Sequence, residues 1–494
     1  MRCTSTLHPS LGKFLLFSYS VAMVRKKMTR IGSCLFLTAT ALLVLSCSGK
    51  GSSTNDAANA TNDESSPQAV APAELARRQQ EEAIGSFVQS LDPVQRYSQL
   101  FLVNLEGNRS FSPVERLQWG ALPEEDLLPG GYLFFSYNIA ETPAQVAEFT
   151  ASIQRWSQQR GMVPPLLAVD QEGGMVNRLR SVTSPLPSAR QVAQSLTASQ
   201  AQSLYAAQAA QMSLLGFQMN LSPVAEAESQ HNSAFLDSRS FGGLGTMEEF
   251  AVAAIQGFQS QGLMAVAKHF PGNTNDDPHS GLPEIALNQQ ELERLYLEPF
   301  RQVLQAGNPW AVLMSHARIS TSGTAAPLHD SETPACLSRF WVTDILRNTF
   351  QYQGLVLSDD IFMAALEKNG FPPHKAVMLA LEAGIDVIML SEKRFGSVLR
   401  LILDRSQSDA DFAALLDRAV ERVIAAKVQV GLLTFRPATE DASMSASADT
   451  GEPSAADRLE LVPTQRALWS QEDWDAVYQQ GMELYQAGFG GTSE

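Results

Sequence analysis

Eight short apolar runs constrain the fold of this chain more than any other feature. Most are rich in Val, Leu, Ile and Phe without strict polar alternation, which is typical of parallel strands buried on both faces. The segments between the runs are long enough for crossover helices, and 147–159 and 376–384 have helical spacing. Eight strand–helix units in succession predict an α/β fold, a (β/α)8 TIM-type barrel. The runs are 98–105, 130–137, 165–170, 217–224, 264–270, 310–316, 354–359 and 385–390.

The alternative to a barrel is an open, doubly wound sheet. That fold commonly carries a glycine-rich phosphate loop directly after a strand. No G-x-G-x-x-G or P-loop motif follows any of the eight runs in this sequence. The pattern therefore favours the barrel.

The charge balance is acidic, with 52 Asp and Glu against 36 Lys and Arg and a net charge of −16. Nucleic-acid binding needs a basic face to contact phosphates, so no nucleic-acid partner is expected. Hydrophobic residues make up 44% of the chain, enough for a large core. We expect a monomer.

The N-terminal region has the pattern of an export signal. Four basic residues between Arg25 and Arg30 precede an apolar run over 31–45 that ends in VLSC at Cys47. The run is short for a transmembrane helix. It resembles a bacterial lipoprotein signal, which implies lipidation of Cys47 and a lipid-anchored protein of the cell envelope, facing the periplasm or the surface. An uncleaved anchor and an ordinary signal peptide are the alternatives.

Composition divides the rest of the chain. Ser, Asn, Ala and Pro dominate residues 48–73 and 437–458. This composition is typical of disordered, flexible tethers. After signal removal only Cys47 and Cys336 remain, so we expect neither a structural disulfide nor a zinc cluster. The predicted parts are a signal region 1–47, a tether and lead-in 48–84, a barrel domain 85–436, a linker 437–458 and a C-terminal helical extension 459–494. We expect the extension to pack on the barrel; the alternative is that it binds a partner.

Polar residues follow the predicted strands where a barrel places its active site, at the carboxyl ends. These strand ends are 169–180, 222–226, 268–272, 315–318 and 358–360. Any one of them alone is compatible with a solvated strand end, but five together favour an active site. Carboxylates and guanidinium groups suit the hydroxyl groups of a sugar. A metal site on His269, His279 and His316 is the alternative; the chain lacks an HExxH pair, and no metal or cofactor is expected.

Five motifs in order resemble glycoside hydrolase family 3, and in particular its single-domain β-N-acetylhexosaminidase branch. The resemblance spans roughly residues 90–435. The motifs are VDQEGG at 169–174 with Arg178, SPV at 222–224 with Glu226, SRSFGG with Arg239, KHFPG at 268–272 with DPH at 277–279, and SDD at 358–360.

The resemblance implies a retaining exo-glycosidase that removes terminal β-linked N-acetylglucosamine. Asp359 is then the nucleophile that forms a covalent glycosyl-enzyme, and His279, oriented by Asp277, is the acid/base. The same resemblance assigns the sugar-binding roles. They fall to Asp170, Arg178, Arg239, Lys268 and His269.

Three positions depart from the family pattern. Asn273 stands where a second loop histidine is expected, Pro278 replaces a small hydroxyl residue, and Met175 replaces an arginine found in many relatives. Two rival functions stay open, and the departures at Asn273 and Pro278 support only the second. One is a family 3 β-glucosidase or xylosidase, and the other is a sugar-binding lipoprotein without catalysis.

Overall fold

The computed structural model describes residues 72–105, 128–276, 281–322, 330–390, 394–438, 458–464 and 469–490. All of them belong to one compact unit, Ala69–Glu494. The predicted signal region and Cys47, the pair Asp277 and His279, and most of the predicted linker lie outside the described residues. The boundaries drawn from composition therefore stay predictions.

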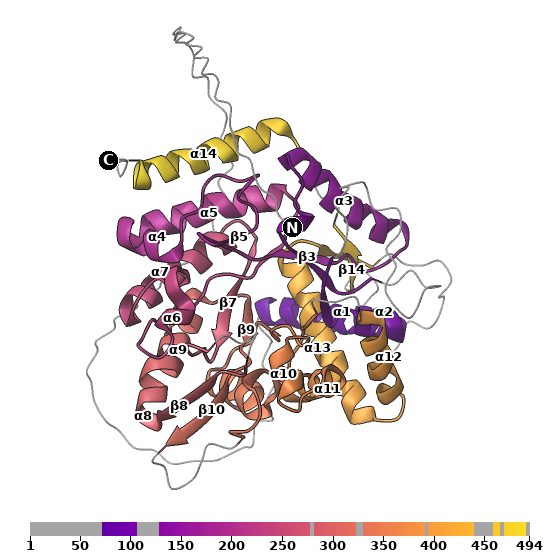
Figure 1. Ribbon diagram of the computed structural model, residues 1–494. Coiled ribbons are helices and arrows are strands. Elements are labelled where there is room, and N and C mark those ends of the chain that lie inside the picture. Colours follow the sequence, from indigo (N-terminus) through magenta and orange to yellow (C-terminus); the bar gives the residue numbers. More distant parts are fainter. Residues whose placement is uncertain are drawn as a thin grey trace, which may run out of the picture. The chain divides into compact units, whose positions relative to one another are not determined.

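Eight parallel strands form one sheet in the order β11-β9-β7-β6-β3-β2-β1-β12. Figure 1 labels β3, β7 and β9 of this sheet. A parallel bridge between Leu357 and Val387 links its first strand to the segment that enters its last, so the sheet closes on itself. Each strand lies within one of the eight predicted runs, which confirms the TIM-type barrel and rules out the open sheet. The strands are β1 Phe101–Asn104, β2 Gly131–Phe134, β3 Leu166–Val169, β6 Met219–Asn220, β7 Met264–Phe270, β9 Ala311–Met314, β11 Leu355–Leu357 and β12 Ile388–Leu390.

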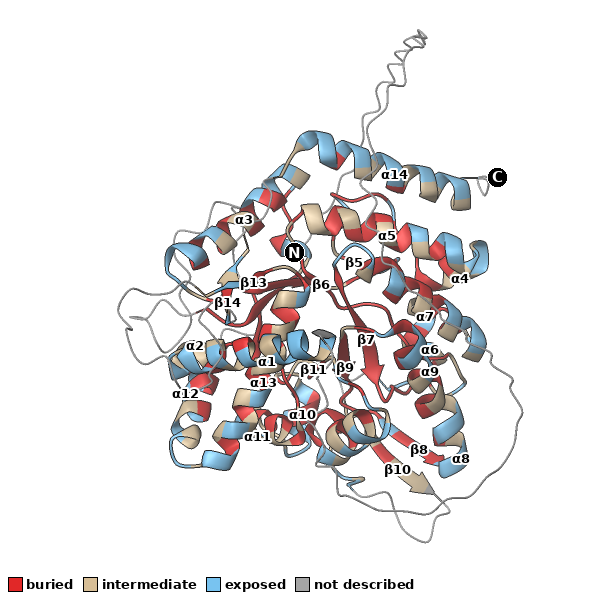
Figure 2. Ribbon diagram, turned by 180° about the vertical axis from the view of Figure 1, so that it is seen from behind, coloured by how far each residue is buried: buried red, intermediate tan, exposed pale blue. Residues whose placement is uncertain are grey.

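The strands are buried on both faces because their side chains alternate between two cores. In β3, Leu166 and Ala168 join a smaller apolar cluster that draws a side chain from every strand of the barrel. Leu167 and Val169 join the larger cluster, which includes the surrounding helices. This double burial explains why the runs lack polar alternation. Figure 2 shows the buried strands and the exposed outer faces of the helices.

Helices follow the strands, and polar residues at several of their first turns set where they begin. Thr142 caps α3 in a reciprocal arrangement with Gln145, and Thr197 caps α5 with Gln200. The helices around the barrel are α1 Pro72–Ser90, α2 Pro93–Ser98, α3 Pro143–Gln159, α4 Ala189–Ser195, α5 Ala198–Leu214, α7 Leu244–Gln259, α8 Gln289–Leu292, η3 Glu293–Leu297, α9 Glu298–Gly307, η5 Phe340–Thr349, α10 Ala364–Lys368, α11 Pro373–Ala383, α12 Phe395–Ser406 and α13 Ala410–Gln429. Helix α1 begins inside the segment expected to be tether and lead-in.

Shorter elements decorate the carboxyl ends of the strands. They are η1 Ser136–Asn138, β4 Gln171–Gly173, β5 Val176–Asn177, α6 Ser233–Leu236, η2 Asp237–Arg239, β8 Glu284–Asn288, β10 Arg318–Ser322 and η4 Ala335–Leu337. Strands β4 and β5 form an antiparallel pair directly after β3. Strands β8 and β10 pair in parallel outside the barrel sheet.

The C-terminal region adds a hairpin-like pair and a helix. Strand β13 (Leu433–Pro437) pairs antiparallel with β14 (Leu459–Pro463). Helix α14 (Gln471–Phe489) begins at Ser470, whose hydroxyl accepts from the backbone N–H of Asp473, and it lies beside α5 (Figure 1). Within the described part of the chain, no helix combines the length and apolar character needed to span a bilayer.

Candidate active site

The charged residues predicted at the strand ends meet at one end of the barrel. Asp170 follows β3, Lys268 and His269 lie near the end of β7, and Asp359 follows β11. Since all eight strands are parallel, their carboxyl ends open on the same side, where barrel enzymes carry their active sites. The order of strands also places β3, β6, β7, β9 and β11 next to one another in the sheet.

Lys268 is the centre of a buried cluster of charges. Its Nζ lies 2.7 Å from Oδ1 of Asp170 and 2.6 Å from Oε1 of Glu172. Arg239, from η2, donates through Nε and Nη2 to the two carboxylate oxygens of Glu172, each at 2.8 Å. A bidentate guanidinium–carboxylate pair fixes the plane of both groups. Three of the predicted sugar-binding residues therefore form one network around Glu172.

The charges in this network set one another's pKa. Burial raises the pKa of Glu172, but the charges of Lys268 and Arg239 lower it more, so the net pKa is far below the ordinary value. Burial lowers the pKa of Lys268, yet the two carboxylates raise it above its usual value. Burial and the charge of Glu172 raise the pKa of Asp170, and they outweigh the charge of Lys268, which lowers it. The net pKa of Asp170 is therefore above its ordinary value. Glu172 is thus a fixed anion and Lys268 a fixed cation near neutral pH.

Glu226 organises the neighbouring part of the site. Its Oε1 lies 2.7 Å from Nδ1 of His269, and its Oε2 accepts from the backbone N–H of Asn273 at 2.6 Å. The side-chain amide of Asn273 donates to Oε1 at 3.0 Å. Burial raises the pKa of Glu226, but the hydrogen bond and charge of His269 and the bonds from Asn273 lower it below its usual value. Asn273, one of the departures from the family pattern, is therefore a buried partner of Glu226.

Asp359 is half-buried directly after β11. Its Oδ1 accepts from the backbone N–H of Asp360 at 2.8 Å. Burial raises its pKa, but electrostatic interactions with His316, His269 and Lys268 and the bond from Asp360 bring the pKa below its ordinary value. A carboxylate held ionised beside three cationic or potentially cationic groups is equipped to attack an electrophilic carbon. The neighbouring carboxylate of Asp360 is used locally, because its Oδ1 accepts from Phe362 N.

Arg178 stands in the loop that follows β5. The side chain of Gln171 fixes this loop, because it donates to Oδ1 of Asn177 at 2.8 Å and accepts from the backbone N–H of Leu179 at 3.0 Å. The guanidinium lies over the ring of Phe135, with 5.8 Å between Cζ and the ring centroid. Its Nε is buried, and no described residue accepts a hydrogen bond from it. An unused buried donor of this kind suits a polar group of a bound ligand.

The predicted acid/base pair cannot be placed beside this cluster. Asp277 and His279, together with Pro278, lie outside the described residues, which end at Asp276 and resume at Gly281. Their role stays a prediction. Asn273, which precedes them in the loop, is anchored to Glu226.

Sequence reasoning gave no catalytic or sugar-binding role to three residues that the structure places in the site: Glu172, Glu226 and His316. Each belongs to a strand-end segment that the sequence singled out. Glu172 and Glu226 are acids within the quoted motifs, and His316 lies in SHAR at the end of β9. Their partners come from other strands, so the sequence alone gave no signal for their pairing.

The metal alternative gains no support from the described residues. Among them, no three His, Cys, Asp or Glu side chains are grouped so that they could hold an ion. Nδ1 of His269 is bound to Glu226, and Nδ1 of His316 lies against the thiol of Cys336.

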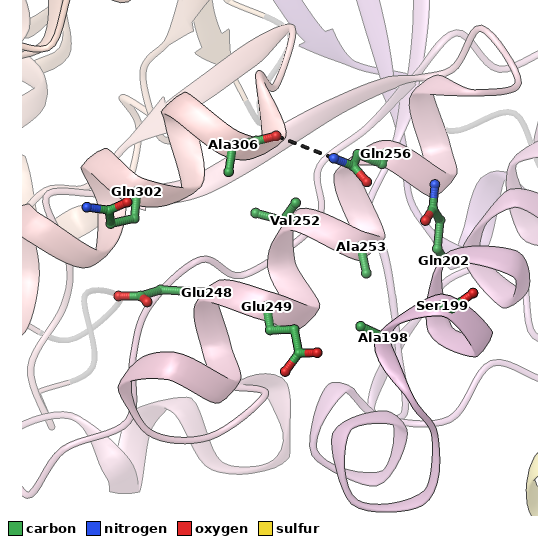
Figure 3. A pocket seen from close by; sticks show the side chains of 10 residues that line it. All are labelled: Ala198, Ser199, Gln202, Glu248, Glu249, Val252, Ala253, Gln256, Gln302 and Ala306. Carbon is green, nitrogen blue, oxygen red and sulfur yellow. Dashed lines mark hydrogen bonds between the residues drawn. The ribbon is translucent and has the colours of Figure 1, made fainter.

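A separate groove of about 480 Å³ lies on the outside of the barrel between α5, α7 and α9 (Figure 3). Its walls carry Gln202, Gln256 and Gln302, together with Glu248 and Glu249. None of the predicted site residues lines it. The groove is therefore distinct from the charged cluster at the barrel mouth.

A parallel barrel whose mouth presents an ionised carboxylate, a buried Lys–Glu–Arg network and a histidine is typical of a barrel enzyme. Residues 125–426 match the family described as Glycosyl hydrolase family 3 N terminal domain. The chain belongs to glycosyl hydrolase family 3 and is a glycoside hydrolase, as its curated relatives and structural neighbours support.

The chain is also similar to named members of the family. It is 33% identical to a beta-hexosaminidase of Nitrosomonas eutropha over 53% of this chain and 74% of that protein. It is 34% identical to a beta-hexosaminidase of Pseudomonas aeruginosa over 55% of this chain and 78% of that protein. A family 3 beta-N-acetylglucosaminidase from Paenibacillus sp. has a similar structure. The two structures superpose with a TM-score of 0.62 at 27% identity. The match covers 79% of this chain and 68% of the Paenibacillus protein.

Proposed function

We propose that this glycoside hydrolase is a retaining, exo-acting β-N-acetylhexosaminidase that removes terminal β-linked N-acetylglucosamine from cell-wall fragments or other glycans. The observation that carries the proposal is the Asp359 carboxylate after β11, whose Oδ1 accepts from the backbone N–H of Asp360 at 2.8 Å and whose pKa lies below its ordinary value. The substrate class is supported by relatives named beta-hexosaminidase and beta-N-acetylglucosaminidase.

In the first step an oxygen of Asp359 attacks the anomeric carbon of the terminal sugar. A C–O bond to the enzyme forms as the glycosidic C–O bond breaks, and the imidazolium of His279 gives its proton to the leaving oxygen. In the second step water attacks the same carbon. The neutral His279 takes a proton from that water, and Asp359 is released as a carboxylate. Asp277 orients the imidazole and stabilises its charged form.

The buried charge network would hold the sugar for this attack. Asp170, Lys268, Arg239 and His269 present planar or multi-donor groups that match sugar hydroxyls. Lys268 and Arg239 are already fixed by Glu172, so little side-chain freedom is lost when the sugar binds. Arg178 adds a buried donor that no described residue uses.

The activity is tested by comparing aryl β-N-acetylglucosaminide with aryl β-glucoside and β-xyloside as substrates, for the wild type and for Asp359→Ala. We expect preferential turnover of the N-acetylglucosaminide, with hydrolysis abolished in the variant. Preference for the glucoside or xyloside would support the β-glucosidase alternative. Tight glycan binding in calorimetry without turnover would support the sugar-binding lipoprotein.

We also propose that Cys47 carries a lipid that anchors the enzyme in the cell envelope. The basic segment, the apolar run and the terminal cysteine of the N-terminal region support this. The test is fatty-acid labelling and membrane fractionation of the wild type and of Cys47→Ala in a bacterial host. We expect the label and the membrane association in the wild type only. An unlabelled wild type would contradict the anchor.

A further inference from the structure

Cys336 is a fully buried free cysteine that contacts His316, the residue bound to the turn of the proposed nucleophile, and the proposed mechanism gives it no role. Its Sγ lies 3.0 Å from Nδ1 of His316. The backbone fixes this approach, because Cys336 N donates to Ser315 O at 3.1 Å and Ala335 N donates to Ala317 O at 2.9 Å. The thiol and the imidazole are thus held together by the segments that carry them.

The second ring nitrogen of His316 determines which way the hydrogen bonds run. Nε2 lies 3.0 Å from the backbone carbonyl oxygen of Asp360. A carbonyl oxygen can only accept, so Nε2 must carry the hydrogen. In a neutral ring Nδ1 is then a bare acceptor. Burial and the charge of Asp359 raise the pKa of the Cys336 thiol well above its usual value, so the thiol keeps a proton to donate.

The bond to Asp360 reaches the proposed nucleophile through one residue of backbone. Asp360 accepts from His316 with its carbonyl and donates its N–H to Oδ1 of Asp359 at 2.8 Å. On either side, Ser358 N donates to Val387 O at 3.0 Å and Ile361 N donates to Met389 O at 3.1 Å. Hydrogen bonds therefore tie the two ends of the turn that carries Asp359 to β12 and to Val387, the residue before it. His316 binds the turn between these two points.

We infer that Cys336 is a positioning residue for the nucleophile: its thiol donates to Nδ1 of His316, keeps the ring in the neutral Nε2–H form that the Asp360 carbonyl requires, and thereby fixes the Asp359–Asp360 turn. The catalytic consequence rests on the proposed function of Asp359. The tautomer itself does not.

The first test reads the tautomer directly. The chain contains 7 histidines, so ¹⁵N-histidine labelling gives a small set of ring resonances, and a His316→Asn variant assigns those of His316. We expect an unprotonated Nδ1 and a protonated Nε2 at neutral pH in the wild type. A protonated Nδ1, whether in the other tautomer or in an imidazolium, would overturn the inference. This measurement needs neither substrate nor a folded Cys336 variant.

The second test separates the hydrogen bond from packing. Cys336→Ser keeps a donor, whereas Cys336→Val fills a similar volume without one. Because misplaced reacting groups chiefly lower the rate of the chemical step, we expect Cys336→Val to lower kcat by about ten-fold with KM within about two-fold. Cys336→Ser should recover most of this loss, and its His316 spectrum should match the wild type. Ser338→Ala, a buried change two residues away, should leave kcat unaltered.

Each outcome of the second test decides one question. Wild-type kcat in Cys336→Val, or equal losses in Cys336→Ser and Cys336→Val, would overturn the positioning role. Full turnover by Asp359→Ala would instead reject the proposed nucleophile, and the ring spectra of His316 in the wild type and in Cys336→Val would still report whether the thiol keeps Nδ1 unprotonated.

Discussion

Nζ of Lys268 lies 2.6 Å from Oε1 of Glu172, and both side chains are almost completely buried at the mouth of the barrel. The pair joins the end of β7 to the loop after β3, and Arg239 extends it to η2. Each group is charged and buried, so removing one partner leaves the other as an uncompensated buried charge, which destabilises the fold. Two predictions about stability depend on this arrangement.

Glu172→Gln should destabilise the protein while keeping the shape of the side chain. Removing one charge leaves Lys268 and Arg239 with a buried excess of positive charge, and the expected loss is about 3 kcal/mol of unfolding free energy. Urea denaturation measures it. The matched control is Glu74→Gln, which breaks an exposed pair with Arg77 and should leave the denaturation midpoint unchanged. Equal midpoints for all three proteins would contradict the account.

The acid side of the stability curve should also change in Glu172→Gln. The pKa of Glu172 in the folded protein is below its ordinary value of 4.5, so its ionisation contributes stability that is fully present above that value. This contribution is lost as the pH falls towards the folded pKa. The wild type should therefore lose more unfolding free energy than the variant between neutral pH and pH below 4.5. If the stability curves of the wild type and the variant ran parallel over that range, the pKa of Glu172 would not be lowered in the folded state.

Asn273 offers a test of the Glu226 network with an isosteric change. Asn273→Asp would place a carboxylate where an amide donates to Glu226 at 3.0 Å. Two buried like charges repel, so this variant should be less stable than Asn273→Ala at neutral pH. The difference should shrink in acid, where the carboxylates take up protons. Thermal unfolding at the two pH values measures it, and equal melting temperatures at neutral pH would argue against the contact.

Lys427 should give the protein an alkaline stability dependence. It lies fully buried in α13, donating to Oε1 of Gln99 at 2.6 Å and to Pro164 O at 2.8 Å, and burial lowers its pKa well below 10.5. The unfolded chain binds the proton that the folded protein lacks, so stability rises with pH between the folded pKa and 10.5. Lys427→Met should remove up to about 1.4 kcal/mol per pH unit from this slope. Identical slopes in the alkaline range just below 10.5 would contradict the assignment.

Gly481 marks the contact between the C-terminal helix α14 and the barrel. A Cβ at this position would clash with Oγ of Ser184 and Nε2 of Gln211, so Gly481→Ala should lower the melting temperature. Gly245→Ala in α7 is the control, because a Cβ there meets nothing and alanine favours helix. A Gly481→Ala protein as stable as Gly245→Ala would show that α14 does not pack closely on α5.

The barrel was predictable because its signal is local. Leu166 to Val169 are buried on both faces, so the chain shows an apolar run wherever a strand lies, and the polar residue after the run marks the barrel mouth. The pairings inside the site were not predictable. Glu226 meets His269 and Asn273 across two strands, and Cys336 meets His316 through backbone bonds that no sequence pattern encodes. The role of Asn273 was hidden for the same reason, since its partner is distant in the chain.

The covalent glycosyl-enzyme on Asp359 is the central claim, and trapping it is the most direct test. A fluorinated N-acetylglucosaminyl donor that forms the intermediate quickly and releases it slowly should label the wild-type enzyme with one sugar. Peptide mapping by mass spectrometry should then place that sugar on Asp359, and Asp359→Ala should remain unlabelled. A label on another carboxylate, or turnover of the donor with no covalent adduct, would contradict the mechanism.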